Sequence, residues 1–266
     1  MATEPLSGQW HDATILQIAG ESGRQRADVL EFLQGYLTSD TERLGESALP
    51  TALCNLKGRV VANGWLVKTL PDTLGLVVHT TLADRVTEFL APYLRFSKCN
   101  PAPPLERPVV ANSAAIQENP DSYIHLFDDW YLVSPANDAI PDNSDIEHPD
   151  ISAALLHSLL EQKVPWISAP VTEQFLPQVL ELERIGAIDF DKGCYLGQEI
   201  VARAQFRGAV KKGLHRYDWH NEPPKVGAKV EVEVGTEEGA ETERYTVVNI
   251  CTDPTDASTG WALGVS

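Results

Sequence analysis

The sequence lacks several features that would assign it to large protein classes. No apolar run in its 266 residues approaches the ~20 residues that cross a bilayer, so we expect no membrane span. The N-terminal segment, M-A-T-E-P-L-S-G-Q-W, has no basic region followed by an apolar one. We therefore expect no secretory signal and a cytoplasmic location.

Common ligand-binding motifs are also missing. No G-x-G-x-x-G follows a predicted strand and there is no Walker A motif, so the sequence gives no support for dinucleotide or nucleoside triphosphate binding. The cysteines contain no C-x-x-C pair, which argues against a zinc ribbon or a redox dithiol. They are Cys54, Cys99, Cys194 and Cys251. We expect free thiols in a reducing cytosol and no stably bound metal.

The charge is strongly acidic but unevenly distributed. A net charge of −17 repels phosphate backbones, so direct nucleic-acid binding is disfavoured. Residues 192–216 nevertheless carry six basic residues and one acidic residue, whereas residues 221–266 carry nine acids and three bases. The basic segment is either a solvated helix face or a site for a small anionic ligand. Its coincidence with the motif described next favours the ligand site.

The segment Lys192–Glu199, K-G-C-Y-L-G-Q-E, is the most reactive stretch of the chain. It places an amine, a thiol, a phenol, an amide and a carboxylate within eight residues, together with two glycines. The sequence that follows Gly197, Q-E-I-V-A-R-A-Q, predicts a short helix. The motif is therefore expected to be a loop that leads into a helix N-terminus, where free N–H groups attract anions and lower thiol pKa values.

Cys194 is the candidate reactive residue of this loop. A nucleophilic hydrolase would need a histidine base within hydrogen-bond reach, and the histidines nearest in sequence are His215 and His220. A stable metal site would need three or four donors. Neither requirement is met within the motif, so the thiol alone does not predict a complete active site.

The other polar residues of the segment leave alternatives open. Glu199 is either a helix-start residue or an acceptor for ring N–H groups, and Arg203 lies four residues on, where it can pair with Glu199. Tyr195 is either core or a stacking surface. Arg207 and Lys211 could bind carboxylates.

A second candidate lies in the turn Asn55–Arg59, between two predicted strands of a hairpin. Lys57 and Arg59 flank Gly58 in an otherwise acidic half of the chain. The alternative is an ordinary solvated turn.

The periodicity of the chain predicts an α+β fold. Helices are expected at Arg24–Leu37, Leu82–Tyr93 and Ile151–Glu161, and hairpins at Ala52–Leu70 and Tyr123–Val133. Asn100–Pro108 contains four prolines and predicts an extended linker. After Gly213, regularly spaced short strands predict a small antiparallel barrel or sandwich.

Several separated segments resemble one family. K-G-C-Y-x-G-Q-E followed by I-V-A-R-A-x-F-R-G-A-x-K is similar to the signature of the YgfZ proteins, which are folate-binding relatives of the glycine-cleavage T-protein, an aminomethyltransferase. Further similar segments occur in the same order as in the family, and together they span roughly Leu16 to Leu214. They are Phe32–Asp40, Leu53–Arg59, Gln174–Gln178 and Gly186–Phe190.

The resemblance implies a T-protein-like ring. Residues 1–212 would form two intertwined α+β lobes, one built mainly from about 40–120, and residues 213–266 a C-terminal antiparallel β-barrel, shorter than usual. Tetrahydrofolate, or another reduced folate, would lie in a central channel. The implied role is iron–sulfur cluster assembly or repair and thereby tRNA modification, with iron–sulfur or tRNA-modifying enzymes as protein partners. Cys194 would be the reactive thiol, and the folate-binding residues would be Lys57, Arg59, Lys192, Tyr195, Gln198, Glu199 and Arg203.

Some positions depart from the family pattern. The T-protein has an Asp pair, one of them catalytic, where this chain has Ala62 and Asn63. Without that carboxylate, aminomethyl transfer lacks its acid–base group, so we expect no turnover. The alternative is a folate-dependent aminomethyl or one-carbon transferase. Folate-stacking tryptophans are replaced by Ala13 and Leu155, and Trp10 and Trp166 lie nearby but out of register.

Overall fold

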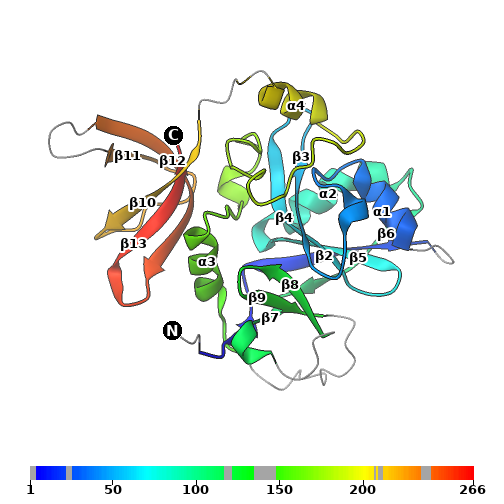
Figure 1. Cartoon of the computed structure of the whole chain (residues 1–266), viewed down its shortest axis with the longest axis horizontal. Helices are drawn as coiled ribbons and strands as arrows, with labels where there is room; N and C mark the ends of the chain where they lie inside the picture. The colour runs from blue at the N-terminus through cyan, green and yellow to red at the C-terminus, as the bar shows by residue number, and fades with distance from the viewer. Residues whose placement is uncertain are drawn as a thin grey trace.

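The computed structural model describes residues 4–21, 26–116, 122–134, 148–206, 208, 212–234 and 241–266. Within them, strands form three antiparallel sheets, and the α-helices lie around these sheets (Figure 1). The helices are α1 (Arg26–Gln34), α2 (Ala83–Leu94), α3 (Ser152–Glu161) and α4 (Gln198–Phe206). The predicted α+β class is confirmed, with strands dominant.

The first two sheets are interleaved along the chain. The chain starts in the small sheet with β1, builds the whole five-stranded sheet, and then returns to the small sheet. In spatial order the small sheet is β1 (Ser7–Gln9), β7 (Val109–Asn112), β9 (Trp130–Val133) and β8 (Tyr123–Phe127). The five-stranded sheet is β3 (Leu49–Cys54), β4 (Val60–Lys68), β5 (Thr73–His79), β2 (Ala13–Gly20) and β6 (Cys99–Glu106).

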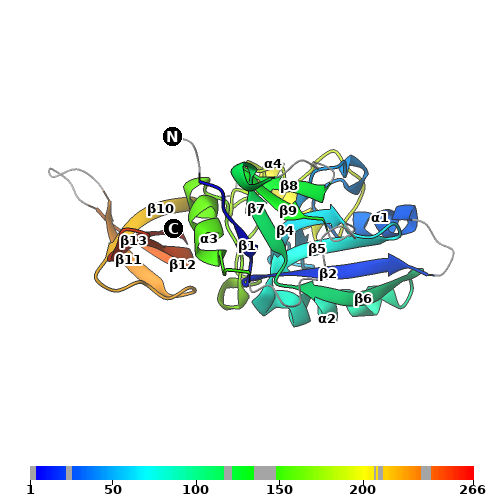
Figure 2. The same ribbon diagram turned by 90° about the horizontal axis from the view of Figure 1, so that it is seen from below.

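Strand β4 is an inner strand of the five-stranded sheet, between β3 and β5. Every residue from Val60 to Val67 is buried, so the strand is covered on both faces rather than alternating between core and solvent. Helix α2 packs on this sheet, with Val86 and Leu90 buried (Figure 2). The predicted hairpins at Ala52–Leu70 and Tyr123–Val133 are confirmed as β3–β4 and β8–β9.

The predicted linker at Asn100–Pro108 is wrong. The segment is extended, but it forms the edge strand β6, which pairs antiparallel with β2 from Cys99↔Gly20 to Glu106↔Thr14. Proline has no N–H to donate, yet an edge strand tolerates it because half of its backbone groups face away from the partner. The prolines also block further pairing at this edge.

The C-terminal strands form a third sheet. Its spatial order is β10 (Leu214–His220), β13 (Asp256–Val265), β12 (Glu241–Asp253) and β11 (Lys229–Val234). The sheet curls as a half-barrel, and within the residues described β10 and β11 remain its two edges, so a closed barrel is not formed there. Helix α3 buries Leu155, Leu159 and Leu160 and lies between this sheet and the rest of the molecule (Figures 1 and 2).

A segment after α3 joins the third sheet to the five-stranded sheet. Asn63 on β4 donates to Pro165 O at 2.7 Å and accepts from Ile167 N at 3.0 Å. Asn249 on β12 accepts from Trp166 N at 2.9 Å and donates to Trp166 O at 2.8 Å. Both asparagines are buried. We call this arrangement the Asn63–Asn249 clamp, because it satisfies the backbone of one strand-like segment from two sides.

None of the described helices is long and apolar enough to cross a membrane. The predicted loop Asn137–Pro149 lies mostly outside the described residues.

Candidate functional site

The K-G-C-Y-L-G-Q-E segment is a loop that leads directly into α4, as predicted. Its residues are anchored to two other parts of the fold. One is the turn that follows α1, and the other is the β3–β4 hairpin turn. The two segments that the sequence singled out, this loop and the turn Asn55–Arg59, are therefore neighbours.

Lys192 lies buried against the end of α1. Its ammonium Nζ donates to three carbonyl oxygens, Gln34 O and Leu37 O at 2.8 Å and Ser39 O at 2.9 Å. Burial lowers the pKa of Lys192 to about 8, although Asp40 and Asp189 act to raise it. All three N–H donors of the charged amine have partners within the protein. Its predicted role as a folate ligand stays a prediction.

Cys194 is the exposed thiol of the chain. Cys54, Cys99 and Cys251 are buried, and burial raises the pKa of Cys54 to about 12. Exposure makes Cys194 the thiol that an external electrophile or partner can reach. No group of three or more His, Cys, Asp or Glu residues in the described part of the chain could hold a metal ion.

Gly197 makes the closest contact between the loop and the hairpin turn. Its φ is +84°, and a Cβ built on it would lie 2.4 Å from Asn55 O. Gly58 in the turn faces Ile200 of α4 in the same way, with 3.0 Å between its built Cβ and that of Ile200. Glycine is needed at 197 because two backbones approach each other there without room for a side chain, and at 58 the positive φ of +68° favours glycine.

The hairpin turn itself is held by Asn55 and Glu173. Asn55 Oδ1 accepts from Lys57 N at 2.9 Å and from Arg59 N at 3.1 Å, while its Nδ2 donates to Glu173 at 2.7 Å. Burial acts to raise the pKa of Glu173, but hydrogen bonds from Arg85 and Asn55 outweigh it, so the pKa is lowered. The turn is therefore rigid. Lys57 is exposed, and Arg59 donates to Gln174 O at 2.5 Å.

The remaining predicted ligands of the motif have mixed surroundings. Tyr195 is 7% exposed and its ring lies 5.3 Å from Lys192 Nζ, so it belongs to the core of the loop. Glu199 and Arg203 pair at 2.6 Å on the exposed face of α4, an ion pair of the kind that contributes little to stability. Gln198 begins α4. Arg207 and Lys211 lie outside the described residues.

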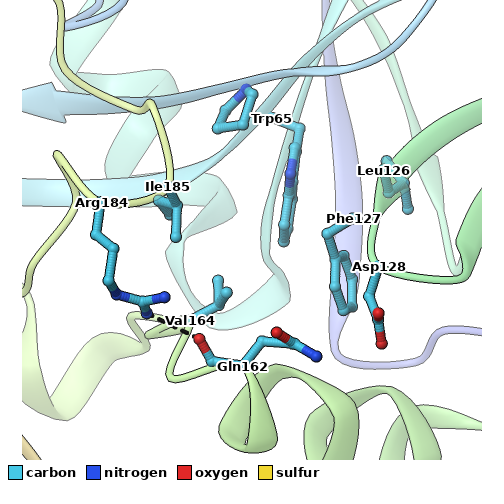
Figure 3. Close-up of a pocket in the computed structure, with 9 residues that line it drawn as sticks. Trp65, Leu126, Phe127, Asp128, Gln162, Val164, Arg184 and Ile185 are labelled. Atoms are coloured by element: carbon cyan, nitrogen blue, oxygen red, sulfur yellow. Dashed lines mark hydrogen bonds between the residues drawn. The ribbon is translucent and has the colours of Figure 1, made fainter.

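A pocket of about 240 Å³ lies elsewhere, between the five-stranded sheet, the β8–β9 turn and the end of α3 (Figure 3). Trp65 and Phe127 stack along one side, with ring centroids 5.4 Å apart and planes 20° from parallel. Asp128 and Gln162 supply polar groups at the rim, and Arg184 donates to Gln162 O at 2.8 Å. The lining residues are Pro50, Trp65, Leu126, Phe127, Asp128, Gln162, Val164, Arg184 and Ile185.

None of the residues predicted to bind folate lines this pocket. Trp65, Phe127 and Arg184 carry no signal in the sequence, because each belongs to a different element and has the pattern of an ordinary core or surface residue. Trp10 and Trp166, the out-of-register tryptophans, are both buried and stack on each other at 4.9 Å. They complete the aromatic cluster behind Trp65 rather than line the pocket.

No family model matches the chain. The chain is 30% identical over 236 residues to the "tRNA-modifying protein YgfZ" of Cronobacter sakazakii, covering 78% of this chain and 71% of that relative. It is 30% identical over 241 residues to the protein of the same name in Escherichia coli strain K12, covering 79% and 72%. A solved structure of the glycine cleavage system aminomethyltransferase T from Bartonella henselae superposes with a TM-score of 0.65 at 15% identity, covering 99% of this chain and 78% of that one.

Proposed function

The chain belongs to the YgfZ family, and from that premise we propose that it binds tetrahydrofolate or another reduced folate and supports iron–sulfur cluster assembly or repair, and thereby tRNA modification. The pocket of Trp65 and Phe127 is the observation that carries the folate part of this proposal. The pyrimidine half of a reduced pterin is flat and edged with N–H donors, whereas its other ring is partly saturated. Stacked aromatic rings beside a carboxylate suit such a ring system.

We place the pteridine ring in this pocket, with Asp128 as the acceptor for its N–H groups (Figure 3). A volume of about 240 Å³ is below the roughly 300–1,000 Å³ of sites that enclose a whole drug-sized ligand. The pocket therefore takes a ring system, and the rest of a folate would extend outside it. Lys57, Arg59 and Arg203 are the cations that we expect for an anionic tail.

Calorimetric titration with tetrahydrofolate tests this placement. Asp128→Asn should weaken binding about tenfold, because it removes a charge-assisted hydrogen bond, and Phe127→Leu should weaken it about threefold to tenfold through lost stacking. Asparagine also tolerates the positive φ of +47° at Asp128, so the turn should be kept.

The matched controls are Lys57→Ala and Arg203→Ala, which change the motif and turn but not the pocket. We expect them to weaken binding less than Asp128→Asn does. The absence of binding by the parent chain would exclude the folate part of the proposal. If only the two controls lost affinity, the ring would lie at the motif instead.

Cys194 is the group through which we propose that the protein acts in cluster maintenance. Cys194→Ala should fail to restore the tRNA modification of cells that lack their own family member, while it binds tetrahydrofolate as the parent does. The thiol is exposed, so its removal should leave the core intact. Full complementation by Cys194→Ala would show that the thiol has no role. The protein partners in this role, iron–sulfur or tRNA-modifying enzymes, and the cytoplasmic location belong to the same proposal.

Aminomethyl transfer is not part of the proposal. The T-protein-like fold is shared, but a likeness at 15% identity supports a common architecture and not a common reaction. Asn63 stands where the T-protein pattern has a carboxylate, and both ends of its amide are used by the Asn63–Asn249 clamp.

A further inference from the structure

Two anchors hold the Cys194 loop to the same short segment of backbone, on either side of the thiol. Before Cys194, the Lys192 ammonium donates to the carbonyls of Gln34, Leu37 and Ser39. After it, Leu196 N donates to Gly35 O at 3.0 Å. Between these two anchors Gly193 and Cys194 are exposed, whereas Tyr195 is buried, so the anchored loop presents the thiol to solvent.

A positive charge near the turn 34–39 is expected to stabilise it. The turn begins at Gln34, the last residue of α1, and runs past the helix end, where carbonyls without a helical partner carry partial negative charge. The last turn of α1 contains no basic residue. Lys192, distant in sequence, supplies both the missing charge and three hydrogen bonds. The turn is further shaped by Gln34, whose side chain donates to Asp40 at 2.8 Å and accepts from Thr41 N at 2.8 Å.

We propose that Lys192 is a positioning residue: its ammonium closes the C-terminus of α1 and thereby fixes the loop that presents Cys194. In this role the amine has no N–H left for a ligand. The inference deepens the proposed function, because it names the residue that holds the working thiol in place. Only the importance of Cys194 depends on the proposed function; the positioning role of Lys192 does not.

The test uses the protein without folate, so it is independent of the folate proposal. Lys192→Ala should lower the melting temperature by about 5 °C or more, because buried carbonyls lose their donors. Hydrogen exchange of the Leu196 amide, followed by mass spectrometry of the 187–197 segment, should become at least about tenfold faster as the loop detaches. Lys57→Ala, an exposed lysine with the same charge change, is the matched control and should change neither quantity.

Chemical rescue separates the ammonium from mere packing. Propylammonium replaces the atoms that Lys192→Ala removes, so it should restore slow exchange at Leu196, whereas tetramethylammonium at the same concentration has no N–H and should not. Lys192→Met fills the space without donors, so it should lose protection and resist rescue. This variant also serves if Lys192→Ala fails to fold.

Unchanged exchange and melting temperature in both variants would overturn the assignment, since a lysine that only binds a ligand leaves the free protein unaltered. Protection kept in Lys192→Met but lost in Lys192→Ala would overturn it too, because packing would then suffice. A parent chain that does not bind tetrahydrofolate would defeat the folate proposal without touching this one.

Discussion

Gly197→Ala is expected to lower the free energy of unfolding by about 2–4 kcal/mol. The new methyl group meets Asn55 O at 2.4 Å, and that oxygen belongs to a backbone held by Asn55 and Glu173, so it cannot move aside. The left-handed φ of +84° adds the cost that any residue other than glycine bears there. Chemical denaturation of the parent and the variant measures the difference.

Gly193→Ala is the matched control within the same loop. A Cβ on Gly193 meets nothing within 4 Å, so the change should stay within about 0.5 kcal/mol. Equal losses in the two variants would show that the contact between Gly197 and the hairpin turn is not what holds the loop. We also expect tetrahydrofolate to bind Gly193→Ala as it binds the parent.

Asn63→Asp should destabilise the protein by about 3 kcal/mol or more at neutral pH. The amide nitrogen that donates to Pro165 O at 2.7 Å would be replaced by a carboxylate oxygen facing a carbonyl oxygen in a buried site. Burial and the facing carbonyl oxygen both disfavour the charged form of the introduced carboxyl. Its pKa in the folded state should therefore lie above its unfolded value of about 3.9.

The pH dependence of this loss has a definite sign. Below the unfolded pKa the carboxyl is protonated in both states and its O–H can donate to Pro165 O, so the difference from the parent should be smallest. The unfolded chain loses its proton first as pH rises, so the difference should grow until the folded pKa is passed and then stay constant. Asn100→Asp, the same change at an exposed position, should show no such trend. A loss independent of pH would contradict the explanation.

The loop-to-helix motif was predictable because local sequence determines it. Glycines at 193 and 197 followed by the helical pattern of 198–205 mark a loop and a helix start without any tertiary information. The partners of Lys192 were not predictable, since it binds backbone carbonyls at and after the end of α1 and carbonyls have no sequence signature. A lysine in a glycine-rich motif looks like an anion ligand until its position in the fold is known.

The pocket could not be derived from the sequence for a different reason. Trp65, Phe127 and Arg184 come from strand β4, the end of strand β8 and a loop, and only the fold brings them together. The edge strand β6 was missed because proline is usually read as excluding a strand, and the exception depends on the strand's place in the sheet.

The Asn63–Asn249 clamp bears on how modular the molecule is. The strands after residue 213 look like a unit that could be exchanged between relatives or expressed separately. However, Asn249 supplies hydrogen bonds to both backbone groups of Trp166, far upstream in the chain. Excising the C-terminal sheet would remove the partners of that backbone as well as the cover of α3. A chimera that grafts a foreign C-terminal sheet should therefore need an asparagine at the position of Asn249, on its equivalent of β12, to keep the backbone of Trp166 hydrogen-bonded.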